Sequence, residues 1–418
     1  MIFDEQLDEL DAARTVIKVI GVGGEGKNTI NHLIENEVRG VEFYAVNTDA
    51  QDLKNTHVEP DKRVLIGKHT TGGQGAGGRP EVGRSAAIES EDLIHEMVGE
   101  AQMVIITCGM GGGTGTGAAP VIARVAKEHG CLTLAVCTKP FLSEGPVRAD
   151  YANEGIKEIK KYVDTLIIIP NQRLFTALPQ GTPMLAAYRE ADNVLRKSVQ
   201  GISEIITVNG YVNIDFADIK NTMRDKGTAL LGIGVAKGPN RAVEAVRQAI
   251  HSPILELTID GATDAILQIT ASQNVTANEI KMAMEELRSN SDNNLNIYQG
   301  VAFNNDLGDE FVVTIIATGY KLRENETSYD DMQELINRNL YTEDDDIVTN
   351  LQDDVEEDTP EVVKTDEIFE SNKKGDKKKT RREKREEKRR LKEEKHRKKE
   401  EEQKEDTKKS NPNLPDWL

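Results

Sequence analysis

The segment 109–117, GMGGGTGTG, constrains the fold of this chain more than any other stretch of its sequence. Six of its nine residues are glycines, and each would cost about 0.5–1 kcal/mol relative to alanine inside a helix or strand. The segment follows the apolar run 103–108 and precedes a helical pattern that we expect to begin near Ala118. Such a loop presents consecutive backbone N–H groups to a polyphosphate, and Thr114 and Thr116 add hydroxyls for further contacts or for Mg²⁺. We therefore predict a strand–loop–helix unit that binds a triphosphate.

A second glycine loop lies near the start of the chain. Residues 21–26, GVGGEG, follow the β-branched run TVIKVI and satisfy G-x-G-x-x-G, and Asp49 ends the next apolar run. By itself this pattern favours a Rossmann dinucleotide site in an NAD-dependent oxidoreductase, with a plain strand–helix turn as the other interpretation. The glycines let backbone N–H groups approach a phosphate at the start of a helix. Neither loop has the G-x-x-x-x-G-K-[ST] pattern of a Walker P-loop.

Apolar runs alternate with helical patterns over the first 180 residues. We expect strands at 15–20, 41–49, 103–109, 131–140 and 164–171, with helices between them that include 80–99 and 118–129. Apolar strands that alternate with helices predict a parallel sheet covered on both faces. From 183 to 207, apolar residues at helical spacing predict one helix that is long enough to bridge two domains.

The region 229–320 has the pattern of a smaller unit. We expect four strands and two helices there, at 229–238, 265–272, 296–303 and 310–320 and at 241–252 and 278–290. Their order predicts a mixed sheet with helices packed on one side. The fold class is therefore α/β: a Rossmann-like parallel-sheet domain (14–182), a central helix and loop (183–228) and a mixed α/β domain (229–320).

The composition changes abruptly after Tyr320. Residues 324–370 hold 18 acidic and two basic side chains, which cannot offset the entropy of folding through apolar burial. Residues 373–399 hold 17 basic and 6 acidic side chains, with pairs at i,i+4 that favour a transient solvated helix. We interpret 321–410 as a disordered charged linker; the alternative for its basic part is a patch for acidic lipids or nucleic acid. The last residues, 411–418 (NPNLPDWL), predict a docking peptide for a partner's groove.

Charge and residue counts exclude several protein classes. The formal net charge of −19 argues against specific nucleic-acid binding, because a phosphate backbone repels such a surface. No apolar run approaches the about 20 residues of a membrane span, and the acidic N-terminal segment does not fit a signal peptide. Three cysteines without C-x-x-C spacing predict neither disulfides nor a zinc site, and the seven histidines show no metal-ligand grouping. We expect a cytoplasmic protein without membrane insertion, with no metal held by protein ligands alone, and with its cysteines in the core.

The motif GGGTGTG resembles the signature of the tubulin superfamily, and the chain resembles the FtsZ family of bacterial division GTPases within it. The resemblance covers residues 14–320 and rests on IKVIGVGG, AVNTDAQ, GMGGGTGTGAAPVIA, TKPF, IPNQRL, ADNVLR, GISEII and NIDFADI. It implies a tubulin-like fold, hydrolysis of GTP to GDP with Mg²⁺, and head-to-tail self-assembly. It also implies a scaffold for the division ring at the septum, at mid-cell, with membrane-anchoring division proteins bound to 411–418. An NAD enzyme has no use for the second loop, and a tubulin-like GTPase outside division need not carry the linker and docking peptide.

The resemblance also assigns the nucleotide contacts. It places Gly24, Gly26 and Asn28 on the first phosphate loop, and it places Gly113, Thr114 and Gly115 at the β/γ-phosphates. It places Glu144 and Arg148 at the ribose and nearby nucleotide, and Asn171 and Asp192 at the guanine edge. Asp192 makes chemical sense alone, because a carboxylate can accept two hydrogen bonds from the N1 and N2 donors of guanine. Without the resemblance, it would be interpreted as an exposed helix acid.

Hydrolysis of GTP needs an in-line water and a group that orients it. The segment 213–218, NIDFAD, offers Asn213, Asp215 and Asp218 just after the long helix. On spacing alone it is an N-capping loop for the next helix. The resemblance implies that it enters the nucleotide site of the next subunit. There Asp215 and Asp218 would polarise the attacking water, and Asn213 would help to position it.

Four residues depart from the family pattern. Glu25 stands where the family has a small residue and places a negative charge near the phosphates. Lys27 lies two positions later and offers a positive charge to offset it, so we count both among the nucleotide-binding residues. Arg79 replaces a usual Asn in a loop facing the γ-phosphate, and Pro146 interrupts a commonly basic stretch. We expect these changes to affect turnover and nucleotide dwell time and not the class of nucleotide.

Overall fold

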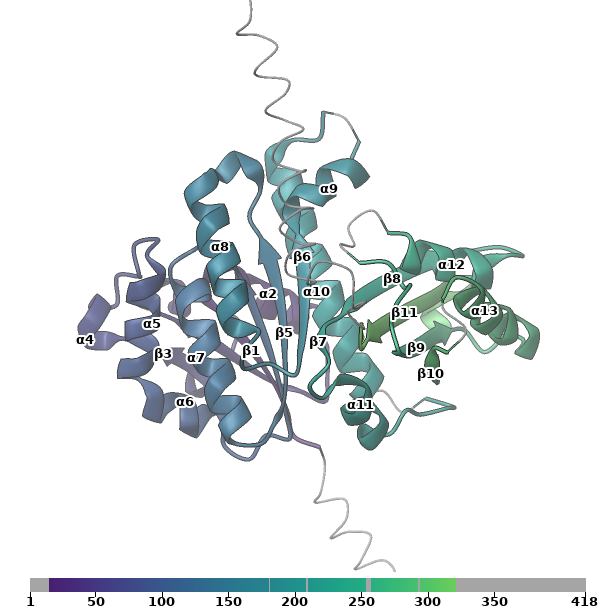
Figure 1. The fold of residues 1–418 in the computed structure, drawn as a ribbon, viewed down its shortest axis with the longest axis horizontal. Coiled ribbons are helices and arrows are strands. Elements are labelled where there is room, and N and C mark those ends of the chain that lie inside the picture. Colours follow the sequence, from purple (N-terminus) through teal and green to yellow (C-terminus); the bar gives the residue numbers. More distant parts are fainter. Residues whose placement is uncertain (1–14, 180, 208–209, 253–256, 292–293, 321–418) are drawn as a thin grey trace, which may run out of the picture. The chain divides into compact units, whose positions relative to one another are not determined.

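A computed structural model of the protein describes residues 15–320, except 180, 208–209, 253–256 and 292–293 (Figure 1). The predicted linker, 321–410, and the predicted docking peptide, 411–418, lie outside the described residues. Within the described part, two sheets are joined through one long helix, α10 (Met184–Thr207). This helix begins one residue after the predicted start at 183 and ends at the predicted residue, 207.

The first sheet has seven parallel strands in the order β3-β2-β1-β4-β5-β6-β7. Their bounds are β1 (Ile17–Val22), β2 (Glu42–Asn47), β3 (Arg63–Leu65), β4 (Met103–Gly109), β5 (Leu132–Lys139), β6 (Thr165–Pro170) and β7 (Gly227–Thr228). The chain winds outward from β1 in both directions, so a crevice opens at the carboxyl ends of β1 and β4, where the strand order reverses. Both glycine loops leave the sheet at this crevice, because Val22 pairs with Cys108 in the register of these two strands.

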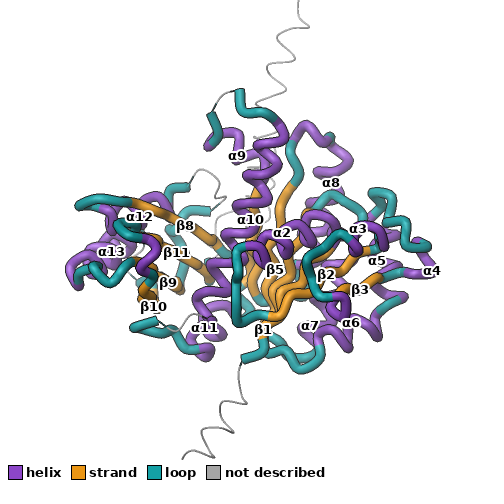
Figure 2. The backbone as a smooth tube through the Cα atoms, turned by 180° about the vertical axis from the view of Figure 1, so that it is seen from behind, coloured by secondary structure: helices purple, strands orange, loops and turns teal. Residues whose placement is uncertain are grey.

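Helices cover both faces of this sheet, as predicted. One face carries α5 (Pro80–Glu89), α6 (Glu91–Val98), α7 (Thr114–Glu128) and α8 (Pro146–Ile159), and the other carries α2 (Gly23–Glu35), α10 and α11 (Phe216–Met223). Figure 1 shows the first group in front of the sheet, and Figure 2 shows α2 and α10 from behind. Short helices α3 (Ala50–Lys54), α4 (Lys68–Thr71) and α9 (Asn171–Ala177) and the 3₁₀ turns η1 (Pro60–Lys62), η2 (Leu142–Glu144) and η3 (Asn305–Leu307) complete the chain.

Two predicted helix boundaries are wrong. The single helix expected over 80–99 is broken at Ser90, whose side-chain oxygen accepts a hydrogen bond from the Gly67 backbone N at 2.9 Å. The helix expected to begin near Ala118 begins at Thr114, inside the glycine loop. Glycines permit this early start, because Gly113, Gly115 and Gly117 pack directly on backbone and leave no room for a Cβ.

The second sheet has the order β10-β9-β11-β8. Its strands are β8 (Leu230–Ala236), β9 (Asp264–Ala271), β10 (Asn296–Phe303) and β11 (Phe311–Thr318), with β9 and β10 parallel and β11 antiparallel to β8 and β9. Helices α12 (Arg241–Ile250) and α13 (Ala277–Ser289) pack on one face, as expected. The opposite face is also covered, because Leu231, Ile266 and Ile316 share a core with residues of α10 and α11.

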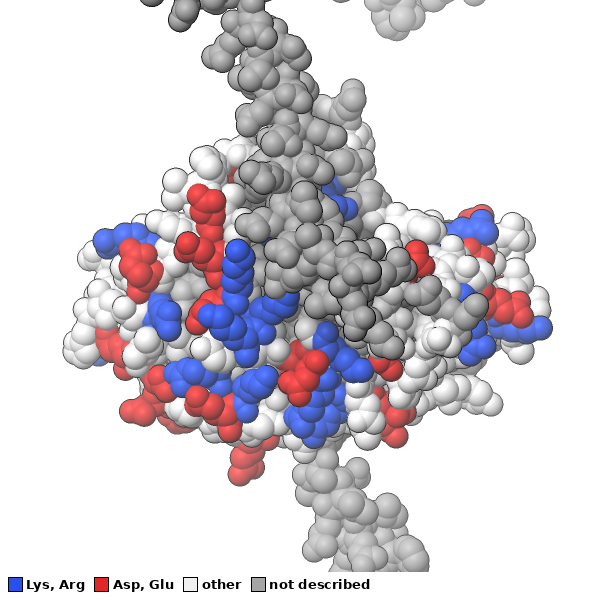
Figure 3. Space-filling model, in the orientation of Figure 1, with Lys and Arg blue, Asp and Glu red and all other residues white. Residues whose placement is uncertain are grey.

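The described surface mixes acidic and basic groups. Figure 3 shows both signs interspersed on the face that carries α5 to α8. All three cysteines are buried, as predicted, and Cys108 and Cys137 lie opposite each other on β4 and β5 with 3.6 Å between their sulfurs. Among the described residues, no helix combines the length and the apolar character that crossing a membrane requires.

Candidate functional site

The two glycine loops pack against each other at the carboxyl ends of β1 and β4. A Cβ on Gly26 would lie 2.4 Å from the Thr107 carbonyl oxygen, and a Cβ on Gly113 would lie 2.9 Å from the Arg79 backbone N. Gly23 and Gly111 have φ values of 75° and 97°, which favour glycine. Glycine is therefore required for the close approach of α2 and α7, whose unpaired N–H groups meet at one place.

A cavity of about 480 Å³ opens where these helix N-termini meet. Ten of the twelve nucleotide-binding residues predicted from the sequence line it: Gly24, Glu25, Asn28, Gly113, Thr114, Gly115, Glu144, Arg148, Asn171 and Asp192. Gly26 and Lys27 do not line it. Gly26 lies beneath the loop against β4, so its contribution is the shape of the backbone.

Lys27 does not pair with Glu25, so that expectation is wrong. The Lys27 Nζ lies 2.5 Å from Asp52 Oδ1 and is buried, and Asn47 donates to the other Asp52 oxygen at 2.7 Å. The physical reason is helical geometry, because residues two apart on a helix point to different sides. Lys27 thus links α2 to α3 and does not neutralise the Glu25 carboxylate.

The Glu25 carboxylate lines the pocket. Its Oε1 accepts a hydrogen bond from the Thr138 hydroxyl at the end of β5. Burial raises the pKa of Glu25 to about 7; the negative charges of Asp192 and Glu144 act in the same direction, and the Thr138 bond and Arg148 act against it. Glu25 therefore exchanges a proton near neutral pH.

Two charged residues line the pocket from the segment after β5. Glu144 and Arg148, one helical turn apart, form an ion pair with each other, and the Phe141 backbone N donates to Glu144 at 2.9 Å. Pro146 begins α8 at a position where proline is favoured, because the missing N–H would have no helical partner there. It therefore provides a favourable first residue for α8.

Polar residues of α9 and α10 also line the pocket. Asn171 follows β6 directly, and its Oδ1 is buried without a hydrogen-bond partner among the described residues. Asp192 lies on α10, and burial raises its pKa. Tyr188 lines the same pocket one turn earlier on α10, and its ring packs edge-on against that of Phe141, with 5.0 Å between the ring centroids. Sequence reasoning missed Tyr188, although its i,i+4 spacing from Asp192 predicts that both share one helix face.

Two threonine hydroxyls in the first turn of α7 have different roles. Thr114 lines the pocket, and its Oγ1 lies 2.7 Å from that of Thr48. Thr116 instead accepts a hydrogen bond from the Gly111 backbone N at 2.8 Å and so holds the loop. Asp49, the acid that a dinucleotide motif would use for ribose, caps α3 by accepting from the Gln51 and Asp52 backbone N. Asp49 does not line the pocket formed by the two glycine loops.

The predicted catalytic residues do not lie at the pocket of their own chain. Asp215 caps α11, and its Oδ1 accepts from the Asp218 backbone N at 2.7 Å, as the capping interpretation predicted. Asn213 accepts from the Gly210 backbone N at 2.6 Å. All three follow the C-terminal end of α10, whereas the pocket residues Tyr188 and Asp192 lie near its start.

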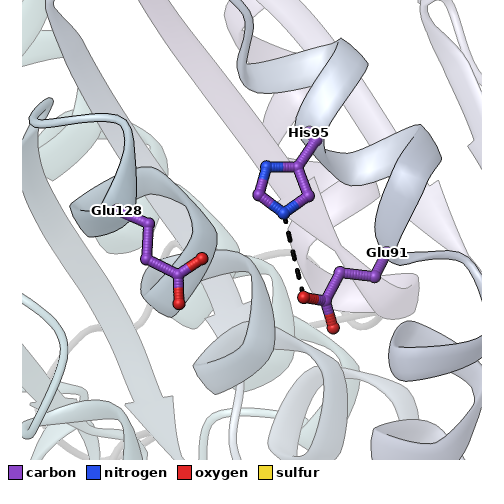
Figure 4. Close-up of side chains that lie close together, drawn as sticks. All are labelled: Glu91, His95 and Glu128. Carbon is purple, nitrogen blue, oxygen red and sulfur yellow. Dashed lines mark ion pairs between the residues drawn. The ribbon is translucent and has the colours of Figure 1, made fainter.

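One group of possible metal ligands does form, contrary to the expectation that the histidines join none. Ligand atoms of Glu91, His95 and Glu128 lie within 4.8 Å of one another on α6 and α7 (Figure 4). Arg124 bridges the two carboxylates, at 2.8 Å from Glu91 and 2.7 Å from Glu128. A guanidinium already balances these charges, so we interpret the group as an ion-pair cluster.

Comparison with known proteins agrees with this geometry. The model of the Tubulin/FtsZ family GTPase domain matches residues 16–179, and that of the FtsZ family C-terminal domain matches residues 227–321. An empty FtsZ dimer from M. jannaschii is 40% identical, with a TM-score of 0.72, over 78% of this chain and 98% of that chain. A point mutant of M. jannaschii FtsZ is 42% identical over 76% and 95%, also with a TM-score of 0.72.

More distant structures share the fold. GDP-bound CetZ1 from Haloferax volcanii is 22% identical over 73% of this chain and 94% of that chain, with a TM-score of 0.63. A GTPγS-bound protofilament of CetZ2 from the same organism is 21% identical over 77% and 99%, with a TM-score of 0.62. Both family models and the 40% identity lead to one conclusion. This chain belongs to the FtsZ family of tubulin-like GTPases.

Proposed function

We propose that the protein binds GTP between its two glycine loops and assembles head-to-tail into filaments that scaffold the division ring at the septum. The observation that carries this proposal is the distance along α10 between the pocket and the predicted catalytic acids. This helix has 24 residues, or about 36 Å at about 1.5 Å per residue. The pocket lies near its start, and Asp215 and Asp218 follow its end. Groups so far apart meet only when a second copy stacks on the first, and such a contact repeats without closing.

Backbone groups bind the phosphates in this proposal. The N-termini of α2 and α7 direct unpaired N–H groups and positive dipole ends into the pocket, where they favour a polyanion. The Thr114 hydroxyl, next to Thr48, offers Mg²⁺ the oxygen ligand that it prefers, alongside the phosphates. Bound Mg²⁺ would neutralise phosphate charge.

The polar end of the pocket selects guanine. The unpartnered Asn171 oxygen needs a donor, because leaving a buried acceptor unpaired costs about 1–3 kcal/mol. Guanine supplies N–H groups, and the Asp192 carboxylate accepts from its N1 and N2, whereas adenine offers no such pair. The Tyr188 ring provides a face for the base.

A neighbouring subunit completes the catalytic site. One carboxylate oxygen of Asp215 caps α11. Within the described part of the chain, no hydrogen bond reaches the carboxylate of Asp218. We assign Asp218 to orienting and polarising the attacking water, with Asp215 assisting and Asn213 positioning. Hydrolysis then weakens the contact that created the site, so the reaction controls filament turnover.

We further propose that 411–418 recruits membrane-anchoring division proteins and that the ring forms at mid-cell in the cytoplasm. The linker 321–410 would act as a flexible tether with a mean span of roughly 50 Å, at about 5–6 Å × √n. The FtsZ dimer, which is 40% identical to this chain, supports self-association.

The test is GTP turnover against protein concentration, with light scattering recorded in parallel. Turnover per subunit should rise from near zero above a threshold concentration, together with scattering. A specific activity that stays constant across the dilution series would contradict a site shared between subunits. Asp92 is an exposed acid on α6. The variant Asp92→Ala should keep the threshold, and it serves as the matched control for Asp218→Ala.

A further inference from the structure

Glu25 is an acid of the pocket to which the proposed binding of GTP assigns no contact. It lies in the first turn of α2, and its carboxylate reaches the ends of two neighbouring strands. Thr138 of β5 donates to one carboxylate oxygen. The other oxygen lies against Gly109 of β4, where an added Cβ would be only 1.8 Å away. The carboxylate is thus fixed between β4 and β5, facing the cavity.

The pocket around Glu25 is poor in available positive charge. Its lining, as far as the structure describes it, holds three carboxylates and one guanidinium, that of Arg148, which is paired with Glu144. Lys27 is turned away to Asp52. The charged and titratable groups that face Glu25 from other elements are Cys108 of β4, Glu144 of η2, Arg148 of α8, and Tyr188 and Asp192 of α10.

A nucleotide polyphosphate adds further negative charge to this cavity. A carboxylate next to a new anion gains affinity for a proton, because a like charge disfavours the ionised form. Once neutral, the carboxyl group has an O–H donor, and the nucleotide offers acceptor oxygens. The ionised group can only accept, and it would repel the ligand.

We propose that Glu25 makes nucleotide binding proton-coupled: its carboxyl takes up one proton as the nucleotide enters and then donates a hydrogen bond to it. The inference rests on the proposed GTP binding. The proton comes from the solvent, and no bond of the nucleotide forms or breaks. Affinity is then highest at low pH and falls as the pH rises, with Kd rising by at most about tenfold per pH unit.

The raised pKa of Glu25 supports this coupling. With a pKa of about 7, Glu25 is mostly ionised at pH 8 and can take up a proton. A rise of one further pKa unit on binding would take up about 0.4 of a proton per nucleotide at pH 8, and a larger rise would approach about 0.9.

Calorimetry of GDP binding with Mg²⁺ tests the inference without hydrolysis. The full chain is titrated at pH 8 in phosphate and in Tris, whose different ionisation enthalpies reveal proton uptake. Wild-type protein should take up at least about 0.4 of a proton per GDP. Glu25→Gln keeps the size of the side chain, and Glu25→Ala removes it. Both variants should bind GDP without the proton uptake that we assign to Glu25. The control Glu96→Gln, at an exposed acid of α6, should retain the wild-type value.

The outcomes separate this inference from the proposed function. GDP binding by wild-type protein without proton uptake would overturn the role of Glu25, and so would uptake that survives in both Glu25 variants. If neither wild-type protein nor the variants bind GDP at any pH from 6 to 8, the proposed function itself is wrong, and the coupling falls with it.

Discussion

Replacing Glu25 by glutamine should stabilise the nucleotide-free protein at alkaline pH. The folded chain holds the pKa of Glu25 at about 7 against an ordinary value of 4.5, chiefly through burial. The folded state therefore binds more protons than the unfolded state between these values, and stability falls as the pH rises through this window and levels off above it. Glutamine cannot ionise, so this loss is absent from Glu25→Gln.

The size of the effect follows from the same two values. A pKa difference of about 2.5 corresponds to about 3.4 kcal/mol at about 1.36 kcal/mol per unit. Because Glu25 is only half-buried and faces an open cavity, water screens part of its charge, and we expect about 2 kcal/mol. A side chain that cannot ionise carries no such penalty at this position.

Urea unfolding of wild-type protein and Glu25→Gln at pH 5, 7 and 8.5 measures this difference. The variant's advantage should be smallest at pH 5, at about 0.8 kcal/mol, and grow to about 2 kcal/mol at pH 8.5. Glu96→Gln, the exposed control on α6, should give a difference near zero at all three values. An advantage of Glu25→Gln that is the same at each pH would refute the reasoning, since it would arise from packing and not from ionisation.

Three further predictions concern the proposed filament. Asp218→Ala should lower GTP turnover by about 100-fold or more while leaving GDP affinity unchanged, so that filaments persist in a sedimentation assay; lost GDP affinity in a dilute titration would place the acid in its own pocket. Gly113→Val should abolish nucleotide binding measured by calorimetry, because an added Cβ meets the Ala76 Cβ at 2.8 Å; binding at wild-type affinity would show that the loop can yield. Deleting 411–418 should leave GTPase activity intact and abolish recruitment in cells, and normal mid-cell localisation of the truncated chain would rule out the docking peptide.

The elements that sequence analysis predicted correctly are those that local chemistry determines. Apolar runs ending in glycine predicted β1 and β4 and the loops after them, because only glycine lets backbone approach backbone so closely. The helical spacing of apolar residues over 183–207 predicted α10, whose apolar side faces the cores of both sheets. Ten of the twelve residues assigned to the nucleotide line one cavity, since loops at neighbouring strand ends must converge.

Tertiary structure decided how the charges are partnered and where helices break. The pairing of Lys27 with Asp52 joins residues 25 apart in sequence, and the break at Ser90 depends on a hydrogen bond from Gly67. The Thr138 hydroxyl that holds Glu25 lies 113 residues away, and no spacing rule reaches that far. A periodic pattern records only which side of an element is buried. The neighbour that a side chain meets, and with it the pKa of Glu25, is set by how separate elements pack in space.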